Sequence, residues 1–347
     1  MSGASTSTNA ALLNRALELH RAGRLDDAAA IYRQLLTDNP GHADAAHLLG
    51  LVCLRNNDFD SAIRLIRGAV EHDPDNPIYH ANLGNVLKDA GQLTDAIAAY
   101  RRALALHPGY AEIHNNLGYV LQASGMIEEG IGHYRKAITL RPADYCAPYN
   151  LGNALFLIGK SEEAIAASER ARSNDPLSFG AYMDVATAYR AAGQFDKAVA
   201  EVRRGLEIVP GQPRGHFQLG VTLLFMGHLN DAIGELETAV RSAKAQRGNP
   251  RFEAYLGYAY AAAGRRQDAR RIVNALEALG RQQYVSSFGI ALIYDALGEK
   301  EPALAAIERA FEDRAVEFAQ MAQYPPFRTI ASEPRFQATM RRLGFPR

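Results

Sequence analysis

The chain has 347 residues, of which 48% are apolar and 22% charged, a composition typical of a folded protein and too apolar for a disordered one. Lys plus Arg and Asp plus Glu both number 38, so the formal net charge is zero and the composition excludes a strongly basic domain that binds nucleic acid. The two cysteines, Cys53 and Cys146, provide neither a disulfide framework nor a Cys-based zinc site.

The sequence carries no recognisable targeting or membrane signal. Residues 1–10 have neither the basic region nor the apolar region of a signal peptide. No stretch approaches the ~18 consecutive apolar residues that a membrane span needs. We therefore expect a cytoplasmic protein without membrane insertion.

A period of 34 residues organises most of the chain. The prolines that recur at this spacing are Pro40, Pro74, Pro108, Pro142, Pro176 and Pro210. If they are position 32 of each unit, the repeats start at Asn9, Ala43, Pro77, Ala111, Tyr145, Phe179, Pro213, Pro250 and Tyr284. The sequence thus predicts a flexible N-terminus (1–8), repeats 1 to 7 (9–246), an insertion (247–249), repeats 8 and 9 (250–317) and a C-terminal capping segment (318–347).

Two further positions of the repeat predict its secondary structure. Position 15 is glycine in every repeat except the second, which has Asn57, and both residue types accept the left-handed conformation that ends a helix. Position 8 is always Gly or Ala, as in Gly84 and Gly118, and position 20 is likewise small, which lets two helices approach closely. Each repeat is therefore predicted to be an antiparallel helix pair, and the fold to be all-α.

These residues resemble the signature of the tetratricopeptide repeat (TPR) family. The resemblance covers residues 9–317 and is clearest in repeat 3, in Leu83, Gly84, Leu87, Ala96, Tyr100, Ala103 and Pro108. It implies an α-solenoid of about nine repeats, a right-handed superhelix with the first helix of each pair on its concave side. The amphipathic stretch 334–343 is predicted to be a capping helix, and the similarity of this tail to those of bacterial TPR proteins implies a bacterial source.

No catalytic, cofactor-binding or metal-binding constellation stands out, so we expect a protein that is not an enzyme. GxGxxG after a strand, GxxxxGK[ST], HExxH and GxSxG motifs are all missing from the sequence. His80, His114 and His216 share position 4 of their repeats, but a repeat spacing of ~10 Å is too long for them to share one metal ion. Packing or surface roles are expected for these histidines.

A local excess of basic residues lies between residues 241 and 271. Its members are Arg241, Lys244, Arg247, Arg251, Arg265, Arg266, Arg270 and Arg271, against the two acids Glu253 and Asp268. The segment could form a binding site for an acidic partner or a phosphate, or it could be a solvated outer face of the helices. We favour the solvated outer face.

The inner face of the first helices is the candidate binding surface. We call positions 2, 5, 6, 9, 12 and 13 of each repeat the inner-face positions, because an array of this kind turns them towards its concave groove. In repeats 3 to 5 they hold six asparagines, which are mediocre helix formers: Asn82, Asn85, Asn115, Asn116, Asn150 and Asn153. Their amides match the donors and acceptors of an extended peptide backbone, and the stripe resembles the asparagine ladder in the TPR region of O-linked N-acetylglucosamine transferases.

A structural role for these asparagines stays open beside the binding role. In the structural alternative, the position-6 asparagines satisfy polar groups between adjacent repeats. In the binding alternative the amides are exposed, and replacing Asn82, Asn116 and Asn150 with alanine is expected to leave the melting temperature unchanged or to raise it.

Aromatic residues at neighbouring inner-face positions are predicted to anchor the apolar side chains of a ligand. They are Tyr119, Tyr149, Phe156 and Phe217. The TPR subclass that clamps a terminal carboxylate has Lys and Arg at positions 2, 5 and 6. Here position 2 of repeats 3 to 5 holds Ile78, Glu112 and Cys146, which disfavours that specialisation.

The sequence predicts a non-enzymatic scaffold that binds an extended polypeptide in the groove of repeats 3 to 5. Two alternatives remain: a partner that presents substrates to a separate glycosyltransferase or other enzyme, and an assembly component of a bacterial secretion or envelope complex. The identity of the partner and the oligomeric state do not follow from the sequence.

Overall fold

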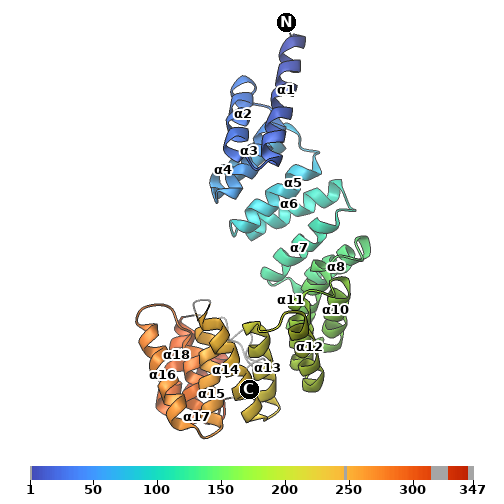
Figure 1. Cartoon of the computed structure of the whole chain (residues 1–347). Coiled ribbons are helices and arrows are strands. Elements are labelled where there is room, and N and C mark those ends of the chain that lie inside the picture. Colours follow the sequence, from blue (N-terminus) through green and yellow to red (C-terminus); the bar gives the residue numbers. More distant parts are fainter. Residues whose placement is uncertain (1, 246–247, 314–326, 343–347) are drawn as a thin grey trace. The chain divides into compact units, whose positions relative to one another are not determined.

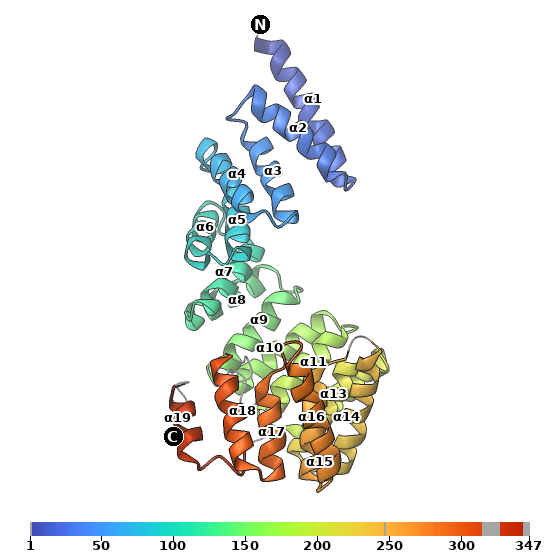
Figure 2. The same cartoon turned by 90° about the vertical axis from the view of Figure 1, so that its left-hand side faces the viewer.

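The computed structural model describes residues 2–245, 248–313 and 327–342. Every regular element in these ranges is an α-helix, which confirms the all-α prediction. The chain divides into two compact units, residues 1–160 and 161–347. In both units, consecutive helices form antiparallel pairs that stack on one another (Figure 1, Figure 2).

The first unit contains nine helices in its described residues. They are α1 (Ser2–Arg21), α2 (Leu25–Asp38), α3 (Ala43–Arg55), α4 (Phe59–His72), α5 (Pro77–Asp89), α6 (Leu93–Leu106), α7 (Ala111–Ala123), α8 (Ile127–Leu140) and α9 (Cys146–Leu157). Helix α1 extends to Ser2 and so includes most of the segment that the sequence predicts to be flexible, since no proline interrupts the chain between Ser2 and Arg21.

The second unit contains the other ten helices of the described residues. They are α10 (Ser161–Asn174), α11 (Phe179–Ala191), α12 (Phe195–Ile208), α13 (Pro213–Phe225), α14 (Leu229–Lys244), α15 (Pro250–Ala262), α16 (Arg266–Gly280), α17 (Ser287–Leu297), α18 (Lys300–Glu312) and α19 (Pro334–Arg342). Helix α19 coincides with the predicted capping helix. Residues 318–326 and 343–347 of the predicted capping segment lie outside the described residues.

Most first helices begin where the 34-residue period predicts. Helix α5 shows why: Pro77 occupies its first turn, and the Asn76 side chain caps it by accepting a hydrogen bond from the Ile78 N–H at 3.1 Å. The first helix of repeat 9 is an exception, because α17 begins at Ser287 and not at Tyr284. Its N-cap residue is Ser286, a residue type favoured at that position.

Position 15 ends the first helix of every repeat, as predicted. The backbone φ there is positive in all nine repeats, from 58° at Asn57 to 83° at Gly125. Among the described residues, Asn57 is the only one other than glycine with a positive φ. The turn thus fixes the length of each first helix and, where both helices of a repeat lie in one unit, brings the second helix back against the first.

The small residue at position 8 makes room for a large one at position 24. A β-carbon added to Gly84 would lie 2.5 Å from the ring of Tyr100, a side chain that is completely buried between α5 and α6. In repeat 4 the two helices meet at Gly118 and Gly130, where a β-carbon on Gly130 would lie 2.8 Å from the Gly118 carbonyl oxygen. These close contacts set the distance between the two helices of repeat 3 and of repeat 4. They thereby hold the inner-face positions of each first helix in place.

Candidate functional site

The six predicted asparagines lie on three helices that pack side by side in the first unit, α5, α7 and α9. We call Asn82, Asn85, Asn115, Asn116, Asn150 and Asn153 the asparagine surface. Asn153 is exposed, whereas the other five are half-buried.

A chain of hydrogen bonds connects the asparagine surface across repeats 2, 3 and 4. The Asn82 amide nitrogen lies 2.8 Å from Nε2 of His47, and Asn85 donates to the Asn82 oxygen at 3.4 Å. The Asn85 oxygen accepts from Asn116 at 3.0 Å and from the Tyr100 hydroxyl at 2.7 Å. Burial raises the pKa of Tyr100, so its hydroxyl remains protonated and able to donate. The core of repeat 3 is thereby connected to its inner face.

A second bond connects repeats 4 and 5, where Asn150 donates to the Asn115 oxygen at 2.9 Å. The structural alternative for the position-6 asparagines is thus observed, since Asn82, Asn116 and Asn150 each bond to the preceding repeat. Each amide has two N–H groups and an oxygen with two lone pairs, so one bond leaves most of its capacity free. The inter-repeat bonds hold the amides in place without saturating them.

Exposed apolar side chains accompany the amides on the same three helices. Tyr119 on α7 and Leu157 on α9 are both 52% exposed, and Ile78 on α5 is 49% exposed. Leu157 and Ile78 were not among the predicted anchors, although they occupy inner-face positions 13 and 2. Their place at inner-face positions is the sequence signal that could have identified them as anchors. The surface therefore combines free amide groups with apolar side chains that face solvent.

The other two predicted anchors of the first unit are less available. Tyr149 is half-buried and stacks on Tyr145, with ring centroids 5.8 Å apart and planes 12° apart. Phe156 is also half-buried. Both residues border the asparagine surface on α9, and only part of each side chain is exposed.

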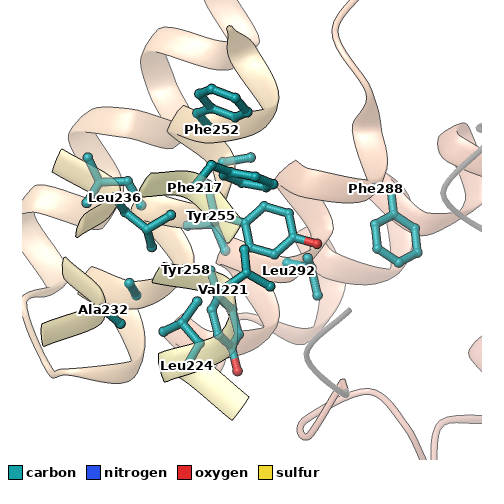
Figure 3. Close-up of a cluster of buried hydrophobic side chains, with 14 of the residues drawn as sticks. Phe217, Val221, Leu224, Ala232, Leu236, Phe252, Tyr255, Tyr258, Phe288 and Leu292 are labelled. Atoms are coloured by element: carbon teal, nitrogen blue, oxygen red, sulfur yellow. The ribbon is translucent and has the colours of Figure 1, made fainter. Parts of the chain in front are cut away.

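Phe217 is buried, and the prediction that it anchors a ligand is wrong. It lies in the second unit and is 5% exposed, because its ring stacks on Phe252 at 4.4 Å and meets Tyr255 edge-on at 5.0 Å (Figure 3). The large side chains of repeat 8 cover the inner-face position that Phe217 occupies. Phe217 is a core residue.

His47 ends the hydrogen-bond chain of the asparagine surface in repeat 2. The ring is 6% exposed and packs on Tyr79 at 4.8 Å, and the Tyr79 hydroxyl donates to Asp44 at 2.5 Å. Burial lowers the pKa of His47 to about 4, against the opposing attraction of Asp44. The neutral ring offers Nε2 as an acceptor to Asn82, whereas a protonated ring would present a second donor to the same amide.

Acid is therefore expected to destabilise the first unit through His47. The pKa of His47 is lower in the folded chain than in the unfolded chain. The contribution of the neutral ring to the free energy of unfolding is therefore complete above the unfolded pKa of ~6.5 and is lost as the pH falls through about 4. Between ~pH 7 and ~pH 5 the free energy of unfolding is expected to fall by about 2 kcal/mol. Urea unfolding of the wild type and of His47→Gln at both pH values measures it. The control is His107→Gln, at an exposed position, and an equal pH dependence in all three chains would contradict the expectation.

The three histidines at position 4 have packing or surface roles, as predicted. Nε2–H of His80 donates to the Pro74 carbonyl at 2.8 Å, and Nε2–H of His114 donates to the Pro108 carbonyl at 3.1 Å. His216 pairs with Glu235 at 2.7 Å. No group of three or more potential metal ligands occurs in the part of the chain that the structure describes.

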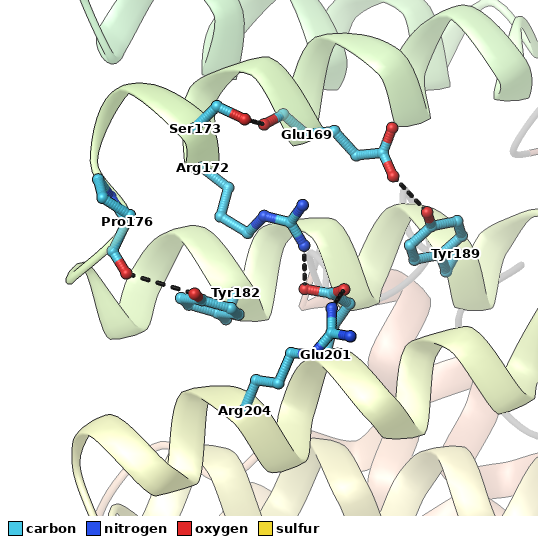
Figure 4. A network of polar contacts seen from close by, with 8 residues as sticks. All are labelled: Glu169, Arg172, Ser173, Pro176, Tyr182, Tyr189, Glu201 and Arg204. Atoms are coloured by element: carbon cyan, nitrogen blue, oxygen red, sulfur yellow. Dashed lines mark hydrogen bonds and ion pairs between the residues drawn. The ribbon is translucent and has the colours of Figure 1, made fainter.

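Sequence reasoning missed a buried ionic network between α10, α11 and α12 (Figure 4). Glu201 is 5% exposed, and its two carboxylate oxygens pair with Arg172 and Arg204, the second at 2.8 Å. The Tyr189 hydroxyl donates to Glu169 beside it. A buried carboxylate with both oxygens paired is a structural group, because neither oxygen is left to act as a base.

Four arginines of the basic segment, Arg265, Arg266, Arg270 and Arg271, pair with carboxylates of the same unit. Arg265 and Arg271 pair with Asp268 at 2.8 and 3.0 Å, and Arg270 pairs with Glu299 at 2.7 Å. Arg247 lies outside the described residues. These pairs favour the interpretation of a solvated outer face.

Comparisons with known proteins identify the repeat. Models described as tetratricopeptide repeat or TPR repeat match residues 19–85, 84–125, 111–144 and 149–213, together more than half of the chain. The chain belongs to the tetratricopeptide repeat family. TPR repeats are in general non-catalytic modules of protein interaction, so this TPR chain is a protein-interaction scaffold. No curated protein sequence matches it.

Solved structures share the TPR fold at low identity. The C-terminal part of a TPR repeat-containing protein from Cytophaga hutchinsonii is 16% identical, with a TM-score of 0.56 over 66% of this chain and 94% of that one. A tetratricopeptide repeat protein from Parabacteroides merdae is 15% identical, with a TM-score of 0.54 over 67% and 92%. PilF from Pseudomonas aeruginosa is 17% identical, with a TM-score of 0.52 over 60% and 96%. At these identities the likeness shows the fold alone.

Among the described residues of the TPR protein, no helix combines the length and the apolar character needed to cross a bilayer.

Proposed function

We propose that the TPR protein binds an extended polypeptide on its asparagine surface. The observation that carries the proposal is the concentration of exposed apolar side chains, Tyr119, Leu157 and Ile78, on the three helices that also present unsaturated amides. Amides pair with the peptide backbone of a ligand, while exposed apolar side chains gain free energy by burial against its side chains.

The free atoms of the surface determine what it recognises. Asn116 and Asn150 each use the amide nitrogen for an inter-repeat bond, which leaves the oxygen to accept from a ligand N–H. Asn115 uses its oxygen, which leaves the nitrogen to donate to a ligand carbonyl. Asn153 is exposed and offers both groups. Backbone recognition of this kind demands little of the ligand's sequence.

Position 2 of the three helices argues for an internal stretch of polypeptide as the ligand. Ile78, Glu112 and Cys146 occupy it, and all three are exposed. None carries the positive charge that would hold a terminal carboxylate. A ligand is therefore expected to pass across the helices without ending there.

Replacing Tyr119 and Asn153 together with alanine is expected to weaken binding without affecting the fold. Both residues are exposed, and Asn153 makes no hydrogen bond to another described side chain, so their loss removes ligand contacts alone. One apolar anchor and one amide correspond to a loss of about 10-fold to 100-fold in affinity. Peptides are selected from a random 12-residue display library on the full-length chain, and their affinities for wild type and variant are measured by fluorescence anisotropy.

The matched control replaces Asn274 and Tyr284, an exposed asparagine and an exposed tyrosine of the second unit, with alanine. Selected peptides are expected to bind this control as tightly as the wild type. If the two double variants lose affinity equally, or if only the control loses it, the asparagine surface is not the binding site.

The two alternative roles predict a narrower range of ligands. A partner that presents substrates to a separate enzyme, or an assembly component of an envelope complex, would capture one defined protein and not a range of extended peptides. Selection of unrelated peptide sequences that all require Tyr119 and Asn153 would favour the general peptide-binding role.

A further inference from the structure

The described C-terminal residues 327–342 pack against the last helix pair. Residues 327–333 form a turn, and α19 follows beside α18 (Figure 2). The helix they contact, α17, is the first helix of repeat 9. The contacts involve Phe288 and Asp295 of α17, which occupy two of its inner-face positions.

A buried carboxylate holds the backbone of this segment. Asp295 is 2% exposed, and its oxygens accept the N–H groups of Arg328, Thr329 and Ile330 at 2.7, 2.8 and 2.9 Å. The Thr329 hydroxyl donates to the Asp295 carbonyl at 2.8 Å. Three successive N–H groups that converge on one anion satisfy a charge that would otherwise be costly to bury. The carboxylate recognises main-chain atoms, so it places no demand on the side chains of these residues.

Apolar anchors flank the carboxylate on both sides. Phe327 meets Phe288 edge-on at 5.5 Å and lies 5.3 Å from Phe336 of α19. Ile330 is completely buried, and Met340 is 5% exposed. The segment therefore inserts an aromatic residue, an aliphatic residue and one face of a short helix into the core of the second unit.

Opposite charges border these anchors. Arg335 pairs with Glu308 through two hydrogen bonds of 2.9 and 2.8 Å and with Glu301 at 2.8 Å. Glu333 pairs with Lys300 at 2.6 Å. Buried anchors, backbone hydrogen bonds and a charged rim are the components of a peptide-binding site.

We propose that α17 and α18 form a second peptide-binding site, which the chain's own residues 327–342 occupy and which accepts the same residue pattern from another polypeptide. The ligand class is a segment with an aromatic residue, three successive backbone N–H groups that end at an aliphatic residue, and a short helix that carries Arg, Phe and Met as Arg335, Phe336 and Met340 do. This site shares no residue with the asparagine surface and does not depend on the function proposed for that surface.

The test uses full-length chains and a fluorescein-labelled synthetic peptide of residues 327–342. The double variant Ile330→Ser, Phe336→Ser, which we call the weakened chain, weakens the packing of residues 327–342 and leaves every residue of α17 and α18 unchanged. The tether gives the wild-type segment an effective concentration of about millimolar, so it outcompetes added peptide. The weakened chain is expected to bind the peptide at least ~10-fold more tightly than the wild type does.

Peptide variants provide controls that do not alter the protein fold. A peptide with Ile330→Ser should lose binding to the weakened chain. A peptide with Arg335→Glu should also lose it, and should recover when the weakened chain carries Glu301→Lys and Glu308→Lys. Equal affinity of wild-type and weakened chains, or no binding to either, would overturn the proposal.

Hydrogen exchange of α17 in the weakened chain covers the case in which the segment is needed for folding. Protection that is lost without peptide and restored when peptide is added supports the site. Protection that is lost and not restored overturns the proposal, because residues 327–342 would then be an inseparable part of the fold.

Discussion

Replacing Asp295 with alanine is expected to destabilise the second unit by about 3 to 5 kcal/mol. The variant leaves the buried N–H groups of Arg328, Thr329 and Ile330 without their acceptor, in a region where Ile330 has no exposed surface. Denaturant unfolding measures the total loss, and hydrogen exchange at residues 328–330 locates it.

The control for this loss is Asp196→Ala in the same unit. Asp196 is exposed in the first turn of α12, where a carboxylate contributes only ~0.3 to 1 kcal/mol through the helix dipole. If the two variants are destabilised by the same amount, the Asp295 carboxylate does not hold the C-terminal segment.

Two glycines of α8, two residues apart, are expected to respond to alanine with opposite signs. A β-carbon at Gly130 would lie 2.8 Å from the Gly118 carbonyl oxygen, so the helices of repeat 4 must separate, at a cost of about 2 kcal/mol. A β-carbon at Gly132 meets nothing within 4 Å, and there alanine should stabilise the helix by about 0.5 to 1 kcal/mol.

Urea unfolding of Gly130→Ala and Gly132→Ala measures the difference, which is expected to be about 3 kcal/mol. Because the substitution, the helix and the solvent conditions are identical, the comparison isolates the helix crossing. Equal stabilities would mean that the second helix of repeat 4 can move away from α7 at no cost.

The fold was predictable because its determinants are local and periodic. Pro77 begins α5, Gly91 ends it, and the same offsets recur through the chain, so each repeat supplies independent evidence for the same helix pair. The predicted start that failed, Tyr284, lies beyond Pro210, the last of the periodic prolines, and α17 begins instead after its N-cap residue Ser286.

The candidate site was only partly predictable, because exposure depends on contacts between repeats. The period places Asn116 and Asn153 on the same face, but the Asn116 amide is bonded to Asn85, whereas Asn153 remains exposed. Phe217 has the register of an inner-face residue and is nevertheless buried by Phe252 and Tyr255. A single repeat contains no information about the neighbour that will cover it.

Glu201 and Asp295 were missed for a related reason. Isolated acidic residues are common on helix surfaces, and nothing in the local sequence distinguishes these two from their neighbours. Their burial depends on partners 29 residues earlier, in the case of Arg172 and Glu201, and 35 residues later, in the case of Ile330 and Asp295. Pairing at such separations appears only once adjacent helix pairs have been stacked.

The bonds of the asparagine surface also bear on how such an array changes in length during evolution. His47 accepts from Asn82 at position 6 of the next repeat, and Asn85 accepts from Asn116, again at position 6. Excision of residues 77–110 would bring Asn116 opposite His47, and excision of residues 111–144 would bring Asn150 opposite Asn85. In either case an amide of the same register meets the waiting acceptor, so gene-level loss or duplication of one such unit leaves the junction chemically matched.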